Sequence, residues 1–351
     1  MRDSRFLRAC RREPTDVTPI WLMRQAGRYM PEYRAIREKV SMLDAIRTPD
    51  IAAEITLQPI SAFKLDAAIV FADILTPLIG MGLDLDFVKG EGPSIDNPIR
   101  TVDDVKKLRT PPATEALPYA MLAIRQIVAE LTPRHIPLIG FAGAPFTLAS
   151  YAIEGGGSKN YERAKGLMYD QPAAWQSLME KLVTVISDYL IQQVEAGASA
   201  LQIFDSWVGA LGPRDYAQSV APYTRQLIQN VKHTGVPIIY FSTGTGPMLD
   251  QVAALGSDVI SVDWRIQIDH AWDQIGHDRA IQGNLDPVLL LAAWPAIQAN
   301  VDAILQQANG QPGHIFNLGH GILPGTPVET VRRLVDYVHE KTAKTEPVKQ
   351  G

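Results

Sequence analysis

Two arginines in the segment Met23–Arg34, MRQAGRYMPEYR, have a spacing suited to binding an anion. Arg24 and Arg28 stand four residues apart, so they share one face of a helix and can also converge in a tight loop. Guanidinium groups bind carboxylates through paired hydrogen bonds and keep their charge at every relevant pH. The alternative is a pair of surface arginines on a solvated face. Gly27 between them and Pro31 after them favour a shaped loop, so the pattern indicates a candidate anion site.

Three further polar side chains follow short apolar runs of the buried-strand type. Asp73 follows AAIVFA, Ser206 follows LQIFD, and His320 follows HIFNLG. If these runs are parallel strands that close into a barrel, all three side chains come to one rim, where such barrels carry their functional groups. The alternative is structural, because Asp and Ser after a strand often only cap the next helix.

The elements that must position these side chains are visible as an alternation of apolar runs and helical stripes. Seven runs are rich in Ile and Val without polar alternation, which is typical of strands covered on both faces. They begin at Ala67, Ile136, Ala200, Pro237, Asp258, Arg279 and His314, and an eighth candidate is PIWLM at Pro19 to Met23. Helical periodicity is clear at residues 178–194 and 328–338, with Pro327 expected in the first turn of the second helix.

This alternation continues without a linker, which predicts a single domain over residues 1–351 with an α/β fold. About eight strands favour a (β/α)8 TIM-type barrel, which typically takes about 250 residues or more. A doubly wound open sheet is the alternative. The tail TAKTEPVKQG, at about 342–351, is polar and is expected to fray.

Composition restricts the partners. The 351 residues are 46% hydrophobic and 20% charged, and 33 basic against 38 acidic residues give a net charge of -5. No general positive field would attract nucleic acid or an anionic membrane, so any anion site must be local.

Cys10 is the single cysteine, which excludes an internal disulfide and sites that need two thiolates. No signal core and no spanning helix are expected, which favours a cytoplasmic location.

Six ordered sequence blocks resemble the uroporphyrinogen decarboxylase family. The first is the arginine segment MRQAGRYMPEYR, which is similar to the family's N-terminal signature nearly residue for residue. The others are FADILTP from Phe71, GAPFTLASYAIEGGGS from Gly143, FDSWVG from Phe204, GNLDP from Gly283 and NLGHGILPGTP from Asn317. GNLDP alone would be weak, but six blocks in the family's order span almost the whole chain.

The resemblance implies a (β/α)8 barrel, commonly a homodimer whose active-site clefts face each other. It also implies an enzyme, a carboxy-lyase of heme and porphyrin synthesis that removes the four acetate carboxyl groups of uroporphyrinogen III. The products are coproporphyrinogen III and CO2. A pyrrole protonated at its α-carbon accepts the electron pair, so no cofactor and no metal are expected.

The same resemblance assigns the site residues. Substrate binding falls to the loop Arg24, Gln25, Ala26, Gly27 and Arg28, and to Asp73, Tyr151, Ser206 and His320. Asp73 is implied as the carboxylate that stabilises the transition state. Our hypothesis is that nearby arginines lower the pKa of Asp73 more than burial raises it. The sequence leaves the proton donor unassigned.

Two rival functions remain at this point. A corrinoid-linked methyltransferase resembles these decarboxylases in fold and in parts of the sequence, but it needs zinc bound through His and Cys, and Cys10 precedes every strand candidate. A tetrapyrrole carrier that has lost catalysis is the second rival. The presence of Asp73 argues against it.

Overall fold

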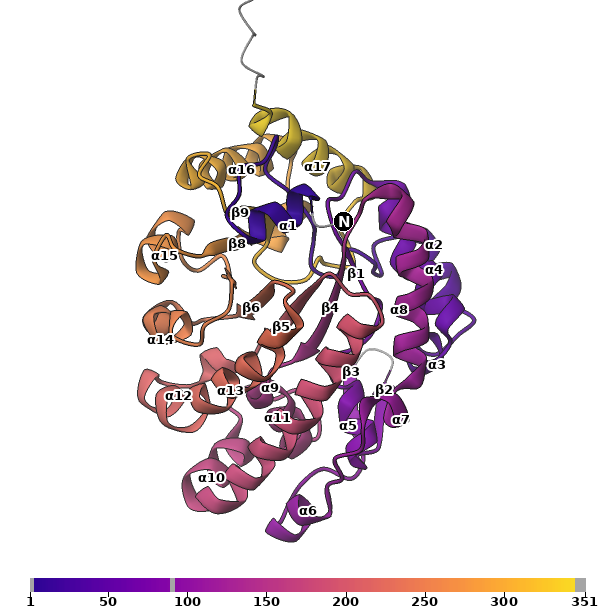
Figure 1. The fold of residues 1–351 in the computed structure, drawn as a ribbon, viewed down its shortest axis with the longest axis vertical. Helices are drawn as coiled ribbons and strands as arrows, with labels where there is room; N and C mark the ends of the chain where they lie inside the picture. Colours follow the sequence, from indigo (N-terminus) through magenta and orange to yellow (C-terminus); the bar gives the residue numbers. More distant parts are fainter. Residues whose placement is uncertain (1–2, 89–91, 345–351) are drawn as a thin grey trace, which may run out of the picture.

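The computed structural model describes residues 3–88 and 92–344, and its centre is a sheet of parallel strands surrounded by helices (Figure 1). All seven predicted runs form strands of this sheet, in the order β1, β4, β5, β6, β7, β8, β9. Their bounds are Ala68–Ile69 (β1), Leu138–Gly143 (β4), Ala200–Asp205 (β5), Ile238–Ser242 (β6), Val259–Ser261 (β7), Ala280–Leu285 (β8) and His314–Leu318 (β9). Each neighbouring pair is parallel, so every strand ends at the same rim.

The segment that was predicted as an eighth strand closes the sheet with very few hydrogen bonds. Ile20 forms an isolated parallel bridge with Phe316 of β9, whose backbone N–H donates to the carbonyl of Pro19 at 2.8 Å. On the other side, the N–H of Asp66 donates to the carbonyl of Ile20 at 2.9 Å, just before β1. The chain around Ile20 therefore joins β9 to the β1 side. The barrel prediction is confirmed, and the open sheet is excluded.

Helices cover the outside of the barrel. The outer helices are α4 (Pro49–Ala62), α8 (Pro118–Leu131), α9 (Pro145–Glu154), α11 (Pro172–Glu195), α13 (Ala221–Val231), α14 (Leu249–Ala253), α15 (Ile268–Ile275), α16 (Trp294–Ala308) and α17 (Val328–Thr342). The shorter helices are α1 (Arg5–Cys10), α2 (Pro31–Arg37), α3 (Met42–Arg47), α5 (Thr76–Met81), α6 (Val102–Lys107), α7 (Ala113–Ala116), α10 (Glu162–Asp170) and α12 (Pro213–Ser219). Five 3-10 turns complete the described helical segments: Thr132–Arg134, Val208–Ala210, Lys232–Thr234, Gly246–Met248 and Pro287–Leu291. Both predicted helical stripes are helices, but Pro327 is the residue before the first turn of α17, not a member of it.

Two apolar layers hold this arrangement. The larger layer lies between the sheet and the outer helices. The smaller layer lies inside the barrel near the starts of the strands, where Phe6 and Cys10 of α1 pack against residues such as Ile139 and Ile315. Helix α1 therefore covers the amino ends of the strands, opposite to the rim that carries the predicted site.

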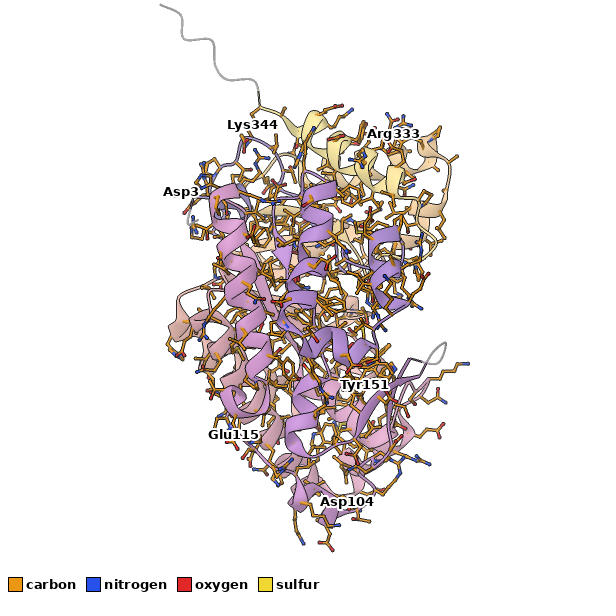
Figure 2. All side chains as sticks on the ribbon, turned by 90° about the vertical axis from the view of Figure 1, so that its right-hand side faces the viewer. Asp3, Asp104, Glu115, Tyr151, Arg333 and Lys344 are labelled. Carbon is orange, nitrogen blue, oxygen red and sulfur yellow. The ribbon has the colours of Figure 1, made fainter. Side chains whose placement is uncertain are left out.

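A two-stranded hairpin was not predicted. Strands β2 (Leu85–Val88) and β3 (Gly92–Ile95) pair antiparallel outside the barrel. The N–H of Ile95 donates to the carbonyl of Gly155 at 2.8 Å, so the hairpin rests on the end of α9. Figure 2 labels Tyr151 of α9 close to this hairpin.

Two sequence expectations concern the surface of the chain. No helix in the described part is long and apolar enough to cross a membrane. Helix α17 ends at Thr342, where the polar tail was expected to start. Residues 345–351 of that tail lie outside the described residues.

Asp66 connects three parts of the chain next to the closing segment. Its carboxylate accepts hydrogen bonds from the N–H of Ile20 at 2.7 Å and from Arg5 Nη1 of α1 at 3.1 Å, and it lies 2.8 Å from His339 Nε2 of α17. Only 7% of the Asp66 side chain is exposed. One carboxylate therefore ties the first helix, the barrel closure and the last helix together.

Asp66→Ala is expected to lower the free energy of unfolding by about 2 kcal/mol, because it leaves buried donors without their charged acceptor. Urea unfolding followed by circular dichroism measures this. The control is Asp336→Ala, which breaks the exposed Lys64–Asp336 ion pair and is expected to change stability by less than about 1 kcal/mol. Equal effects of the two substitutions would contradict the role of Asp66 in barrel closure.

Candidate active site

The arginine segment forms a tight loop at the rim, as the glycine and proline indicated. Arg24 has a φ of 60°, and a Cβ on Gly27 would lie 2.9 Å from the carbonyl oxygen of Arg24, so a side chain at Gly27 would crowd the turn. Gln25 is 1% exposed, and its amide group accepts from the N–H of Leu22 and donates to the carbonyl of Ala67, both at 3.1 Å. The Gln25 side chain thus holds the loop, while Arg24 and Arg28 are exposed.

The loop is joined to the chain that follows β9. The N–H of Met23 donates to Asn317 Oδ1 at 3.0 Å, and the N–H of Ile322 donates to the carbonyl of Met23 at 2.9 Å. The Arg24 side chain lies over Gly321, where a Cβ would be 2.5 Å from Arg24 Cδ. A glycine after His320 therefore allows Arg24 to reach across the rim.

Asp73 lies half-buried between β1 and α5. Its Oδ1 accepts a hydrogen bond from the N–H of Leu75 at 2.9 Å, and its carbonyl accepts one from Thr76 Oγ1 at 3.0 Å. Asp73 is not the cap of α5, because the N-cap is Leu75 and has no side-chain cap hydrogen bond. One carboxylate oxygen nevertheless stabilises the turn before α5. Among the described residues Oδ2 has no hydrogen-bond partner, which leaves it available to a bound molecule.

The pKa of Asp73 is raised, and burial is the largest cause. The hydrogen bond from Leu75 and the charge of Arg24 act in the opposite direction without overcoming it. Our hypothesis that arginines outweigh burial at Asp73 was therefore wrong. The reason is that one guanidinium at the rim does not replace the solvation that the carboxylate loses between strand and helix.

Tyr151 and Ser206 come from neighbouring parts of the rim. Tyr151 is half-buried near the end of α9, and its ring lies 5.9 Å from the ring of Trp207. Burial and the charge of Asp73 raise the pKa of Tyr151, and Trp207 and Arg24 lower it. Ser206 directly follows β5 and is also half-buried, and its carbonyl accepts a hydrogen bond from Thr243 Oγ1 at 2.6 Å.

His320 is a neutral side chain at physiological pH. Burial, together with the positive charge of Arg24, lowers the pKa of His320 to about 4, although Asp263 acts in the opposite direction. A neutral imidazole still offers one N–H donor and one acceptor. The centroid of the His320 ring lies 6.1 Å from that of Phe241. The Phe241 ring packs against Phe204 at 5.7 Å, and the Phe204 ring packs against Phe141 at 5.5 Å. These rings form an apolar layer below the polar rim, in which Phe141 and Phe241 are buried.

The structure brings three of the predicted residues together around Arg24, whose charge acts on the pKa values of Asp73, Tyr151 and His320. Ala26 is half-buried within the same loop. Arg28 is exposed at the outer end of the loop, where its carbonyl accepts a hydrogen bond from Arg34 Nη1 at 2.9 Å. Arg24 is thus the inner arginine of the pair and Arg28 the outer one.

Two charged residues at this rim were not predicted. Asp263 is 4% exposed and accepts hydrogen bonds from the N–H of Gly244 at 2.7 Å and from Arg265 Nη1 at 2.5 Å. The Arg265 guanidinium lies 4.4 Å from the centre of the Trp264 ring. Asp263 follows the end of β7, so the rule that selected Asp73 and Ser206 would also have selected Asp263.

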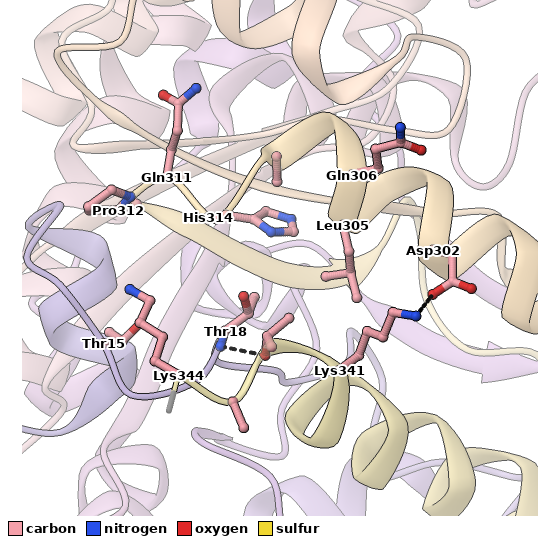
Figure 3. A pocket seen from close by; sticks show the side chains of 15 residues that line it. Thr15, Thr18, Asp302, Leu305, Gln306, Gln311, Pro312, His314, Lys341 and Lys344 are labelled. Atoms are coloured by element: carbon pink, nitrogen blue, oxygen red, sulfur yellow. Dashed lines mark hydrogen bonds and ion pairs between the residues drawn. The ribbon is translucent and has the colours of Figure 1, made fainter. Parts of the chain in front are cut away.

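A cavity of about 540 Å³ lies elsewhere, beside the start of β9 and the end of α17 (Figure 3). Its lining includes Thr18, His314 and Lys341, and none of the predicted site residues. Burial lowers the pKa of His314 to about 4. The cavity is therefore separate from the rim. Within residues 3–88 and 92–344, no group of three or more His, Cys, Asp or Glu side chains could hold a metal ion.

The charge of Arg24 gives a pH-dependent prediction. Arg24→Met is expected to raise the pKa of His320 from its value of about 4, because the substitution removes a positive charge that disfavours the imidazolium. NMR titration of histidine-labelled protein measures the midpoint, with the His320 signal assigned by His320→Gln. Arg37→Met, which changes a half-buried arginine of α2, is the control and is expected to leave the midpoint unchanged. An unchanged midpoint in the Arg24 variant would contradict the proximity of Arg24 to His320.

Comparisons with known proteins identify the family of this chain. A family model described as Uroporphyrinogen decarboxylase (URO-D) matches residues 1–341. A uroporphyrinogen decarboxylase from Roseiflexus sp. (strain RS-1) is 56% identical over 349 residues, which cover 98% of this chain and 100% of the relative. One from Chloroflexus aurantiacus (strain ATCC 29366 / DSM 635 / J-10-fl) is 57% identical over 342 residues, covering 96% of each chain.

Among solved structures, a methyltransferase from Methanosarcina mazei is similar with a TM-score of 0.79 and 20% identity, covering 96% of this chain and 97% of that one. At that identity the likeness shows the fold alone. The sequence relatives and the family model cover nearly the full length. This chain therefore belongs to the uroporphyrinogen decarboxylase family.

Proposed function

We propose that the rim around Arg24 and Asp73 is the active site at which this chain decarboxylates uroporphyrinogen III to coproporphyrinogen III in heme synthesis. The observation that carries the proposal is the grouping of Arg24, Asp73, Tyr151 and His320 at the carboxyl ends of the strands, in a chain that the family model matches over residues 1–341. A substrate with eight carboxylates and an apolar ring system requires both cationic and apolar surfaces, and this rim supplies both.

The chemistry needs a place for one electron pair. Protonation of a pyrrole α-carbon makes the ring cationic, the bond between the acetate methylene and its carboxylate then breaks, and the pair moves into the ring as CO2 leaves. A second proton converts the exocyclic methylene into a methyl group, and loss of the first proton restores the pyrrole. The same reaction steps are repeated at each of the four acetates. The substrate itself is the electron sink, so we propose that no cofactor takes part.

Asp73 is proposed to stabilise the cationic ring. Its free Oδ2 accepts hydrogen bonds from pyrrole N–H groups, and its negative charge is most valuable when the ring becomes positive. This role requires the ionised form. Because the pKa of Asp73 is raised, activity is expected to fall on the acid side as Asp73 takes up a proton.

The remaining residues are proposed to bind and orient the substrate. Arg24 holds a carboxylate beside Asp73, Arg28 holds another at the outer rim, and Gln25, Ala26 and Gly27 shape the loop between them. Tyr151, Ser206 and neutral His320 offer hydrogen bonds to propionates. We assign the arginines to binding, since free arginine is a poor acid with a pKa above about 12. His320 is deprotonated at neutral pH, so it is also assigned to binding.

The alternative function, a corrinoid-linked methyltransferase that needs zinc bound through His and Cys, has little support at this rim. Cys10 is the single cysteine of the sequence, and it lies buried in α1 at the amino ends of the strands. Burial raises its pKa, which disfavours the thiolate that binds zinc. We also propose a cytoplasmic location, which the single reduced cysteine supports.

The division of roles between Asp73 and the arginines is testable with purified, metal-stripped protein and uroporphyrinogen under reducing conditions. Asp73→Asn keeps the shape and removes the charge, so kcat is expected to fall about 100-fold or more. Arg28→Gln is expected mainly to raise KM, because it removes binding that substrate and transition state share. Chromatography of the oxidised porphyrins follows the loss of carboxyl groups.

Asp103→Asn is the control for this series, because Asp103 lies on α6 with 74% of its side chain exposed. It is expected to match the wild type. Near-wild-type turnover of Asp73→Asn would refute the role of Asp73. Absence of any partly decarboxylated product with the wild-type protein would refute the proposed function itself.

We further propose that the chain forms a homodimer through the face that carries the rim, as the family resemblance implies. Val288 and Leu291, in the turn that follows β8, are large apolar side chains with 57% and 50% exposure. Trp264, after β7, is 36% exposed. Apolar side chains gathered beyond the strand ends support a contact between two copies on this side of the barrel.

Light scattering is expected to give twice the chain mass of 38.6 kDa. The double substitution Val288→Glu and Leu291→Glu is expected to yield monomers, since it places charges in the apolar contact. Leu122→Glu is the matched control, because Leu122 is also 50% exposed but lies on the outer helix α8. A dimer that survives the double substitution would place the contact elsewhere.

A further inference from the structure

Asp205 is a buried carboxylate that the proposed mechanism does not use. It is the last residue of β5, directly before Ser206, and it is 0% exposed. Its Oδ1 accepts a hydrogen bond from Thr147 Oγ1 at 2.8 Å, and its Oδ2 accepts one from Tyr240 Oη at 2.7 Å. Each carboxylate oxygen therefore has a neutral hydroxyl donor, and none of the described cations forms an ion pair with Asp205.

Thr147 extends this network to the proposed binding residues. It lies in the first turn of α9, four residues before Tyr151, so the two side chains share one face of the helix. Thr147 Oγ1 donates to Asp205 and also accepts from the N–H of Trp207 at 3.3 Å. The Trp207 ring in turn packs against Tyr151 with 5.9 Å between the ring centroids. One hydroxyl thus connects α9 with the loop that carries Ser206.

Strand β6 fixes the same loop from its other side. Tyr240 of β6 holds Asp205, and Thr243, just beyond β6, donates to the carbonyl of Ser206 at 2.6 Å. Gly209 lies so close to Thr243 that a Cβ would be 2.2 Å from the Thr243 carbonyl oxygen. The chain that follows β5 is therefore held between α9 and β6, and Asp205 accepts a hydrogen bond from each of them.

We propose that Asp205 is a positioning residue, which fixes Tyr151 and Ser206 relative to each other by accepting hydrogen bonds from Thr147 and Tyr240 at once. The proposal rests on the proposed binding roles of Tyr151 and Ser206. The ionised carboxylate accepts one hydroxyl at each oxygen, whereas a protonated carboxyl group carries a hydroxyl donor of its own. An asparagine would present an N–H group to one of the two hydroxyls.

This arrangement costs the fold some stability, which argues that it serves the site. Burial raises the pKa of Asp205 from 3.8 to about 6, although the hydrogen bonds from Tyr240 and Thr147 oppose the rise. The folded chain thus binds this proton more tightly than the unfolded chain does. The contribution of Asp205 to stability therefore declines as the pH rises from about 4 to about 6, and an apolar residue would avoid the loss.

The groups that face Asp205 keep the pH response simple. The titratable side chains against it are Tyr240 of β6 and Tyr216 of α12, both 0% exposed. Burial raises the pKa of each tyrosine, so both remain neutral below pH 8. Asp73, whose pKa is also raised by burial, acts by its charge on Tyr151 beside Trp207. A transition near pH 6 is therefore assigned to Asp205 by its loss in Asp205→Asn, which leaves Asp73 in place.

A matched pair of substitutions at Thr147 tests the proposal. Thr147→Val removes the hydroxyl at nearly constant volume, and kcat/KM is expected to fall about tenfold because two binding side chains lose their fixed relation. Thr147→Ser keeps the hydroxyl and is expected to restore kcat/KM to within about twofold of the wild type. The control is Thr224→Val on α13, since Thr224 is also fully buried and its Oγ1 has no hydrogen-bond partner among the described residues.

Fluorine NMR of 5-fluorotryptophan protein provides a readout that does not depend on activity. The Trp207 resonance, assigned with Trp207→Phe, is expected to shift with a midpoint near pH 6 in the wild type. The shift should disappear in Asp205→Asn, which has no titrating carboxyl group there, and shrink in Thr147→Val. Urea unfolding of each variant identifies losses of activity that come only from instability.

The outcomes separate the two proposals. Wild-type kcat/KM and an unchanged Trp207 resonance in Thr147→Val would overturn the positioning role, as would an equal loss of kcat/KM in Thr147→Ser. Tyr151→Phe and Ser206→Ala test the binding roles directly. If these two variants lose activity while Thr147→Val keeps it, the positioning proposal alone fails. If both keep full activity, the binding roles fail and the positioning role fails with them.

Discussion

The closure of the barrel at Ile20 is the constraint on which the rest of the site depends. Hydrogen bonds on both sides of this short segment join β9 to the β1 side, so the first and last parts of the chain become neighbours. The loop with Arg24 leaves this segment directly, and the chain with His320 leaves β9. Without closure, Arg24 would have no fixed relation to Asp73 or His320, although each lies in a well-defined local structure.

Burial then determines the electrostatics of the closed rim. The pKa of Asp73 is raised and that of His320 is lowered to about 4, so burial favours the neutral form of both. Arg24 is the charge that acts on both, and it favours the ionised form of Asp73 while it disfavours the imidazolium of His320. A single guanidinium therefore pushes the two groups toward an anionic carboxylate and a neutral donor. That combination suits a substrate whose periphery is negative and whose centre becomes positive.

The sequence predicted the strands of the barrel better than it predicted the pKa values of the site. Buried parallel strands produce unbroken Ile and Val runs, so all seven strands were visible. The closing segment PIWLM has the same apolar pattern but forms only one isolated bridge, which the pattern could not distinguish from a regular strand. The hairpin β2–β3 was missed, since it lies outside the barrel and has no buried run. The raised pKa of Asp73 was predicted with the wrong sign, because the depth of a side chain between strand and helix depends on tertiary packing. The double hydrogen bonding of Asp205 was equally hidden, since its partners lie 58 and 35 residues away.

The geometry also explains why the two charged parts of the site should affect catalysis differently. In the proposed mechanism, Arg28 and Arg24 meet carboxylates that stay charged throughout the reaction, so their attraction is nearly the same for substrate and transition state and acts mainly on binding. In the same proposal, Asp73 meets a ring that is neutral in the substrate and positive only after protonation. Its attraction therefore grows along the reaction, and it grows most where burial has removed competing water. The burial that raises the pKa of Asp73 is then the same property that makes its ionised form effective, so the site needs the carboxylate to be partly desolvated and Arg24 to be near it.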